Sequence, residues 1–211
     1  MSAPDVPVDA RDQQIKELEA GLMKARAELE ALQRKVPLNV EQVAKEARRR
    51  FLQFIVSRVN PGAQERQRGD LRSWNPQVWQ EAGQLGLIGF NVPQAIGGEG
   101  KDVATWCLTL EEMGKLIEDP GFLVIVMINK NWARMMHILE RQDLVEKYAR
   151  RMVKGELLLA WGIWEQSDPG FMASVAKKAN GGWVLTAHKP IIIGAQYAGL
   201  FAVVEIGRAH V

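Results

Sequence analysis

The feature that most constrains the fold is a change of hydrophobic periodicity at Gly155. Before Gly155, apolar residues recur every three or four positions, which is the spacing of amphipathic helices. After Gly155, short runs of β-branched and aromatic residues are separated by turns that contain glycine or proline, which is typical of strands. The sequence therefore predicts an α+β chain, in which an N-terminal all-α helical domain precedes an incomplete β-barrel or sandwich-like domain.

Helix-capping residues divide the segment before Gly155 into five predicted helices. Asn or Asp stands at or just before four of the starts, where its side chain can pair with a backbone N–H that the first turn leaves free. Asp119-Pro120-Gly121 separates two of the helices, because proline cannot continue a helix. The predicted caps are Asn39, Asn75, Asp102 and Asp143, and the predicted helices cover residues 40–58, 76–85, 102–117, 122–139 and 143–154.

Five strands are predicted after Gly155, and the turn signal Asn180-Gly181-Gly182 joins two of them into a hairpin. A β-layer with one or two open, apolar edge strands is a poor end point for a domain. We therefore expect a truncated β-domain and a chain that is a fragment. The predicted strands cover residues 157–164, 174–179, 183–187, 191–193 and 200–204.

A heptad pattern precedes the helical domain. Apolar residues alternate at spacings of three and four from Ile15 to Val36, over three heptads. So narrow an apolar stripe needs a partner, which is either a second chain or the helix's own domain. The last six residues resemble the translation of a common DNA-sequencing adapter. We therefore expect a disordered lead and heptad helix over 1–38, a helical domain over 39–155, a β-domain over 156–205 and a non-native tail over 206–211.

Composition excludes several classes of function. A net charge of +2 gives no overall attraction to nucleic acid, and the basic cluster at residues 45–50 is more typical of a solvated helix face. The longest apolar run, residues 122–128, is too short to span a bilayer, and the N-terminus lacks a signal-peptide pattern. The single cysteine, Cys107, excludes an internal disulfide and indicates a reducing compartment. We expect a cytoplasmic protein.

Few patterns in the helical domain indicate chemistry. The glycine loop at 97–100 is not a phosphate-binding loop, because Ala95 and Asp102 stand where glycine and Ser or Thr are needed. The three histidines lack metal-ligand spacing, so no metal site is expected. Cys107 lies beside the predicted buried face of its helix and is expected to be a core thiol. His137, near a helix end, is expected to be a core or capped histidine.

The segment from Trp161 to Gly170 differs from these patterns. It runs from a predicted strand into a Pro-Gly loop that carries two carboxylates and a serine. Two interpretations stay open on the pattern alone. The segment is either a strand end with turn residues, or a loop that offers backbone N–H groups and aromatic surface to a flat ligand.

Motifs spread over residues 40–204 resemble those of the acyl-CoA dehydrogenase family. Each motif is short, but their order and spacing together agree with the family pattern. They are Asn75-Pro76 with Trp79, Leu85-Gly86-Leu87, Val92-Pro93, Gly97-Gly98-Glu99-Gly100, Leu110-Glu111-Glu112-Met113, Asp119-Pro120-Gly121, Lys147-Tyr148, Lys154-Gly155-Glu156, the Glu165 loop, and Gly182-Trp183-Val184-Leu185 with Lys189.

The resemblance implies an activity and its partners. In this family, FAD oxidises the Cα–Cβ bond of an acyl thioester: a carboxylate removes the α-proton and the flavin accepts the β-hydride. The implied substrate is acyl-CoA or an acyl-carrier thioester, the implied partner is an electron-acceptor flavoprotein, and the implied assembly is a homo-oligomer. The catalytic carboxylate belongs to the family's C-terminal helical domain, so we expect no catalytic residue here and an inactive fragment.

The resemblance also implies the positions that contact ligands. The family's flavin-contacting threonine before the glutamate is replaced by Trp164, and a flanking aromatic and a threonine are replaced by Ile191 and Ile193. These departures keep two alternatives open: a helical interaction module that acts through the heptad segment, or a non-catalytic relative that has lost flavin. The implied cofactor contacts are Trp161, Ile163, Trp164, Glu165, Gly170, Ile191 and Ile193, and the implied substrate contacts are Ser167 and Gly170.

Overall fold

The computed structural model describes residues 16, 19–24, 39–70, 74–165 and 173–205. The chain divides into two compact units, Met1–Val40 and Glu41–Val211. In the first unit, the described residues 16 and 19–24 are helical and exposed, and Leu22 is the one heptad position among them. The other heptad positions lie outside the described residues. The docking helix therefore stays a prediction.

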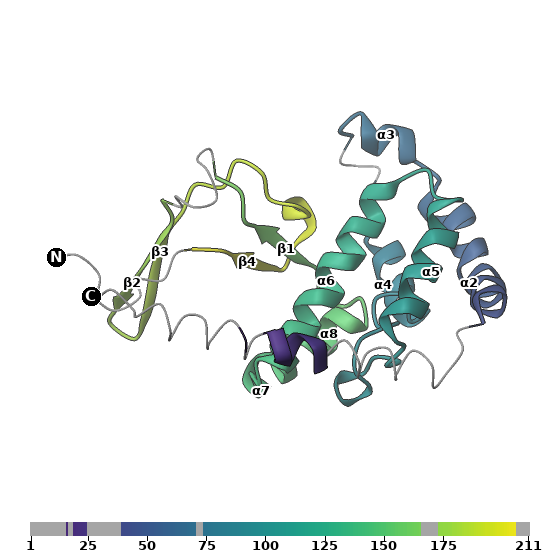
Figure 1. Ribbon diagram of the computed structural model, residues 1–211. Helices are drawn as coiled ribbons and strands as arrows, with labels where there is room; N and C mark the ends of the chain where they lie inside the picture. The colour runs from purple at the N-terminus through teal and green to yellow at the C-terminus, as the bar shows by residue number, and fades with distance from the viewer. Residues whose placement is uncertain (1–15, 17–18, 25–38, 71–73, 166–172, 206–211) are drawn as a thin grey trace. The chain divides into compact units, whose positions relative to one another are not determined.

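Helices fill the second unit up to Gly155, as the periodicity predicts (Figure 1). Two short segments, η1 and η4, are π-helical and continue the α-helices before them. The bounds are α2 (Val40–Phe54), η1 (Ile55–Val59), α3 (Ala63–Gln67), α4 (Pro76–Gln84), η3 (Gln94–Ile96), α5 (Val103–Gly114), α6 (Pro120–Ile138), α7 (Gln142–Leu144), η4 (Val145–Ala149) and α8 (Arg150–Val153).

Two of the predicted helix caps are confirmed by hydrogen bonds. The Asn75 side chain accepts from the backbone N–H of Gln77 at 2.9 Å, and Asp102 accepts from Thr105 at 2.8 Å. The cap predicted at Asp143 is wrong, because α7 begins one residue earlier and Asp143 instead pairs with the Arg141 side chain. The ion pair with Arg141 therefore uses the carboxylate that the predicted cap would have needed.

Two clusters of buried side chains form the core. The first joins α2 with α4, α5 and the first part of α6, and it contains Phe51 and Val126. The second joins the later part of α6 with η4 and α8, and it contains Met152. Leu158 packs into the first cluster, whereas its neighbour Leu159 packs into the second. Because neighbouring strand residues point to opposite faces, the start of the β segment is fixed by both clusters.

The prediction that Cys107 is a core thiol is wrong, because Cys107 is exposed. The buried face of α5 is formed by Trp106, Thr109 and Met113. These positions follow the spacing of one helical face, and residue 107 is turned about 100° away from Trp106. His137, expected to be a core or capped histidine, lies half-buried in the last turn of α6.

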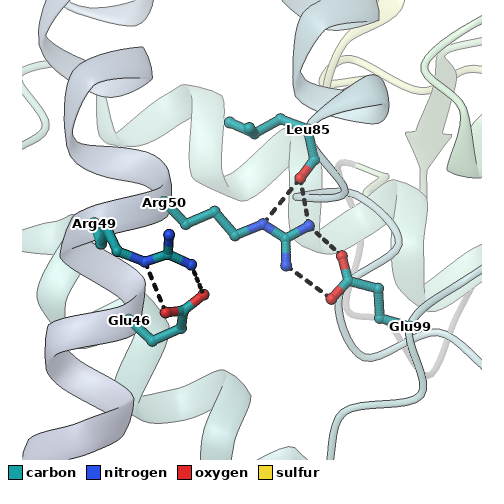
Figure 2. Close-up of polar contacts among 5 residues, drawn as sticks. All are labelled: Glu46, Arg49, Arg50, Leu85 and Glu99. Carbon is teal, nitrogen blue, oxygen red and sulfur yellow. Dashed lines mark hydrogen bonds and ion pairs between the residues drawn. The ribbon is translucent and has the colours of Figure 1, made fainter.

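Arg49 and Arg50 of the basic cluster on α2 both pair with carboxylates (Figure 2). The Arg50 guanidinium donates to Glu99, with Nη1 2.8 Å from Oε2, and to the Leu85 carbonyl, with Nε at 3.1 Å. Arg49 pairs with Glu46 one turn earlier on the same helix. The prediction of a solvated face holds for Arg49, whose side chain is 74% exposed, and is wrong for Arg50, whose side chain is 26% exposed.

The β segment contains two separate two-stranded sheets within the described residues. β1 (Leu159–Gly162) pairs in parallel with β4 (Leu200–Val203), and β2 (Val175–Ala179) pairs antiparallel with β3 (Gly182–Thr186). The hairpin turn is Asn180-Gly181, as predicted. The predicted strand at 191–193 is wrong: Ile193 alone makes a bridge, to Trp161, before the chain turns into η6 (Ala195–Tyr197). None of the described helices is long and apolar enough to cross a membrane.

Candidate functional site

The candidate site starts from the way α6 holds β1. Asn129, fully buried on α6, accepts the backbone N–H of Leu159 at 2.8 Å and donates to the Leu159 carbonyl at 3.2 Å. Its amide also donates to the carbonyl of Ile125 one turn earlier, at 3.0 Å. The side chain therefore pairs with Leu159 as a neighbouring strand would. This contact fixes the position along α6 at which β1 begins.

Beyond Leu159, the same edge of β1 is paired by Ile193. The Trp161 N–H donates to the Ile193 carbonyl at 3.1 Å, and the Ile193 N–H donates to the Trp161 carbonyl at 3.2 Å. Residues opposite each other in such a bridge share a face, and residues two apart along a strand share a face. The structure therefore brings together two residues that the resemblance assigned to the cofactor, Trp161 and Ile193. Ile163, a third, follows directly after the end of β1.

A cavity of about 210 Å³ lies between α6 and β1. Its walls are apolar except for one amide, that of Asn131. The Trp161 ring that lines it has a buried indole N–H with no acceptor in the described part of the chain, a condition shared with the core residue Trp79. A buried donor without a partner costs about 1–3 kcal/mol. The lining residues are Ile128, Asn131, Trp132, Met135 and Trp161.

Glu165 is engaged by protein groups on several sides. Its carboxylate lies 2.7 Å from the Lys189 ammonium and accepts the backbone N–H groups of Ala173 at 2.6 Å and Ser174 at 3.1 Å, together with the Ser174 hydroxyl. The Lys189 hydrogen bond, followed by that of Ser174, lowers the pKa of Glu165 to about 2. The side chains of Glu165 and Lys189 are 7% and 2% exposed.

The remaining assigned residues lie at the edge of this site. The rings of Trp164 and Trp161 are 5.9 Å apart, and Trp164 is 44% exposed. Ile191 is 60% exposed and joins no strand. Ser167 and Gly170 lie outside the described residues, so their assignment stays a prediction. The described residues thus give a partly exposed apolar and aromatic surface that continues into the α6 cavity.

Sequence reasoning missed two residues that build this site. Asn129 stands inside the apolar helix 122–139, where an amide can signal a buried hydrogen-bond partner, but nothing local separates it from the nearby Asn131 or shows that its partner is a strand. The sequence motifs include Lys189 but give it no partner. Its pairing with Glu165 spans 24 positions, so no periodicity reports it. No group of three or more His, Cys, Asp or Glu within the described ranges is arranged to hold a metal ion.

Comparisons with known proteins identify the family of the helical domain and similar folds. A family model described as the acyl-CoA dehydrogenase N-terminal domain matches residues 41–156. Benzylmalonyl-CoA dehydrogenase of Aromatoleum aromaticum is 26% identical over 157 residues, which are 72% of this chain and 41% of that protein. Butyryl-CoA dehydrogenase of Megasphaera elsdenii has a similar fold, with a TM-score of 0.67 and 22% identity over 80% of this chain and 45% of the other.

A third relative was solved with flavin bound. The glutaryl-CoA dehydrogenase of Mycobacterium smegmatis in complex with FADH2 superposes with a TM-score of 0.62 and is 21% identical, over 81% of this chain and 43% of the other. The chain spans less than half the length of each of these three relatives.

Proposed function

Since the chain belongs to the acyl-CoA dehydrogenase family, whose N-terminal domain its residues 41–156 form, we propose that the protein oxidises an acyl thioester with FAD as cofactor. The substrate would be an acyl-CoA or an acyl group on a carrier protein. The electrons would leave to an acceptor flavoprotein. We also propose a cytoplasmic location, consistent with the single cysteine, and a homo-oligomer.

The surface around β1 fits a flavin in two respects. Trp161 and Ile193 share one face, and half-exposed aromatic and apolar side chains suit a flat, largely apolar ring. The unpaired indole N–H of Trp161 offers a hydrogen-bond donor to a ring that carries oxygen and nitrogen acceptors. When bound, FAD would supply the hydride acceptor. The protein would hold the ring against β1 and exclude water from its apolar side.

The α6 cavity supports an acyl chain beside that surface. Ile128, Trp132 and Met135 give it apolar walls, which favour hydrocarbon over a charged or strongly hydrated group. Asn131 is the one polar lining side chain and offers an amide to the carbonyl of the substrate. This cavity, which opens beside Trp161, is the single observation that carries the proposal.

Glu165 is not proposed as the base that removes the α-proton. A carboxylate with a pKa near 2 is a poor proton acceptor at neutral pH, and its oxygens already accept from Lys189, Ser174 and Ala173. Its role is to tie β1 to Ser174 and Lys189. We propose that a residue outside this chain supplies the base, and that the chain by itself is inactive.

A non-catalytic relative is the second candidate. The observation that favours it is chemical: Trp164 and Ile193 carry no hydroxyl, so two side-chain hydrogen bonds expected toward flavin are absent. Each such bond is worth about 0.5–1.5 kcal/mol. Loss of both predicts weaker flavin binding rather than a different fold.

One experiment separates the two candidates. The protein encoded by the uninterrupted reading frame is purified, its oxidised-flavin absorption band is recorded, and acyl-CoA thioesters of increasing chain length are added without oxygen. We expect a yellow protein whose band is bleached by at least one thioester. A protein that stays colourless in excess FAD contradicts the proposal and favours the non-catalytic relative.

A further inference from the structure

A second cavity, of about 340 Å³, lies at the start of α6 and is larger than the α6 cavity beside Trp161. It is bounded by the first turns of α6, by residues in and after α3, and by η6. A protein cavity of about 150 Å³ is enough to hold a benzene molecule. The second cavity therefore has room for a group of ring size together with part of the chain that carries it.

Three aromatic side chains from separate segments meet at this second cavity, which we call the aromatic cavity. The rings of Trp74 and Tyr197 stack, with their centres 4.8 Å apart and their planes at 16°, and the Phe122 ring lies 6.4 Å from that of Trp74. A ring packed against other rings gains more than its buried area alone would give. The wall therefore favours an aromatic group over other apolar groups. Its aliphatic part is formed by Val124, Ile125 and Ile193.

The charged residues of the aromatic cavity disfavour an acidic ligand. Arg66 Nε donates to Asp119 Oδ2 at 2.6 Å, and Arg66 Nη1 donates to the Pro61 carbonyl at 2.9 Å. The side chains of Arg66 and Asp119 are 17% and 14% exposed, so the guanidinium charge is matched inside the protein. Asp70, which also lines the cavity, is acidic. An acyl group that ends in a carboxylate would lose hydration here without gaining a new counter-charge from the described lining residues.

The aromatic cavity and the α6 cavity lie along one side of α6. Val124 lines the aromatic cavity, whereas Ile128 and Asn131 line the α6 cavity, and spacings of four and three residues place all three on one helical stripe. Opposite this stripe, Ile193 lines the aromatic cavity and Trp161 lines the α6 cavity, and the two pair through their backbones. Val124 and Asn131 are about 10 Å apart along the helix axis. One extended ligand can therefore reach both cavities.

We propose that the acyl group of the substrate ends in an aromatic ring, which occupies the aromatic cavity while the carbon chain crosses the α6 cavity. The inference rests on the proposed function, because it assigns the class of acyl thioester that the protein oxidises. The chain contacts Ile128, and the ring contacts Phe122 and Tyr197. A straight alkyl chain would leave part of the larger cavity unfilled and would make no ring–ring contact. The cavity at the start of α6 therefore selects arylalkanoyl thioesters.

The test measures binding, so that it does not depend on oxidation. The protein encoded by the uninterrupted reading frame is titrated by calorimetry with matched pairs of CoA thioesters, phenylalkanoyl and cyclohexylalkanoyl, of increasing chain length. The cyclohexyl ring is close in size to phenyl but is not aromatic. At the chain length that spans both cavities, we expect the phenyl thioester to bind about threefold to tenfold more tightly. Equal affinities within every pair, or no binding of any thioester, would overturn the proposal.

A substitution that fills the aromatic cavity tests where the ring binds. Val124 lines the cavity and is 37% exposed, so Val124→Trp can occupy the space without entering the core. We expect it to weaken binding of the phenyl thioester about tenfold and to leave binding of acetyl-CoA unchanged. Val103→Trp, at a 57% exposed position of α5, is the matched control and should change neither. Unchanged binding of the phenyl thioester by Val124→Trp would place the ring elsewhere and refute the site.

A second pair of variants tests the aromatic contact itself. Tyr197→Leu keeps an apolar side chain but removes the ring, so it should abolish the preference for phenyl over cyclohexyl, whereas Tyr197→Phe should keep it. A preference that survives in Tyr197→Leu would contradict the proposal.

Failure of this proposal is distinguishable from failure of the proposed function. A protein that prefers phenyl thioesters but does not bind FAD would support the aromatic cavity and contradict the oxidation. A protein whose flavin band is bleached by straight-chain thioesters, and which shows no preference for phenyl, would support the oxidation and overturn the assignment of an aryl substrate.

Discussion

The helical body and the β2–β3 hairpin are stabilised in opposite ways. The helices bury their apolar faces against one another, and charged side chains link elements far apart in sequence, as Arg50 does with Glu99. In the hairpin, every residue of β3 is exposed, and Trp183 is 69% exposed. An isolated two-stranded hairpin is marginally stable in water. The helical body is therefore stabilised by its own side chains, whereas the hairpin gains little from the rest of the described chain.

β1 is intermediate in burial between the helical body and the hairpin. Its first residue, Leu159, is buried in the second core cluster and clamped by Asn129, whereas its far end carries the half-exposed surface around Trp161. The stable part of the molecule therefore positions the part that we assign to ligand binding. This arrangement suits a site, because a rigid element holds exposed groups in a fixed geometry.

The largest effect on stability is expected from a substitution that removes the contact between the helical body and β1. Asn129→Ala leaves the N–H and the carbonyl of Leu159 without this buried partner. We expect a loss of about 2–4 kcal/mol in the free energy of unfolding, because each buried unpaired group costs about 1–3 kcal/mol. Urea denaturation followed by circular dichroism measures it. Gln84→Ala, at an exposed position of α4, is the control, and an equal effect of both variants would refute the clamp.

A matched pair of arginines on α2 tests how the helical body is linked (Figure 2). Arg50→Met removes the partner of Glu99 and of the Leu85 carbonyl, at a cost of about 1–3 kcal/mol. Arg49→Met removes an exposed pair with Glu46 and should leave the free energy of unfolding almost unchanged. If the two variants unfold at the same urea concentration, the link between Arg50 and Glu99 does not stabilise the fold.

The acid dependence of stability reports on the Glu165–Lys189 pair. Because the folded protein lowers the pKa of Glu165 from 4.5 to about 2, the pair stabilises the fold above about pH 4.5 and loses its effect as the pH falls toward 2. Glu165→Gln should therefore be less stable than the unsubstituted chain at neutral pH. The difference between their free energies of unfolding should become smaller below pH 4.5. If the difference in the free energy of unfolding between the two proteins stays constant from pH 7 to pH 3, the pKa of Glu165 is not lowered in the folded state.

The smallest effect is expected in the hairpin. Trp183→Ser removes a large side chain that is 69% exposed, so it should change the free energy of unfolding by about 0.5 kcal/mol or less. The same urea measurement checks it. If Trp183→Ser lowers the free energy of unfolding as much as Asn129→Ala does, then Trp183 is buried in solution. The hairpin would then be stabilised by side-chain packing, as the helical body is.

The sequence predicted the features whose causes are local. The caps at Asn75 and Asp102 and the turn at Asn180-Gly181 depend on a few neighbouring residues, and the structure contains them. Some errors were local, such as the cap at Asp143, which pairs with Arg141 instead, and others arose where distant groups decide. The predicted strand at 191–193 failed because only Ile193 reaches a partner, Trp161, 32 positions earlier.

The candidate site was predictable only in part, for the same reason. Its residues at Trp161 and Ile193 were found through the family resemblance, but their hydrogen-bonded pairing was not. Asn129 was not predicted, because burial of a polar group is visible only once its partners are in place. Trp106 and Met113 do lie on the buried face of α5 as expected, but Cys107, which is next to that face in sequence, is exposed.

The central claim is that the β1 surface at Trp161 contacts the flavin, and its most direct test is the affinity for FAD of the complete protein and of its Trp161→Phe variant. Phenylalanine keeps an aromatic ring and removes the indole N–H donor, so we expect the dissociation constant to rise about threefold to tenfold, which corresponds to about 0.5–1.5 kcal/mol. Trp183→Phe, on the exposed hairpin, should leave it unchanged. Equal affinities for all three proteins, or no binding of FAD by any of them, would contradict the account.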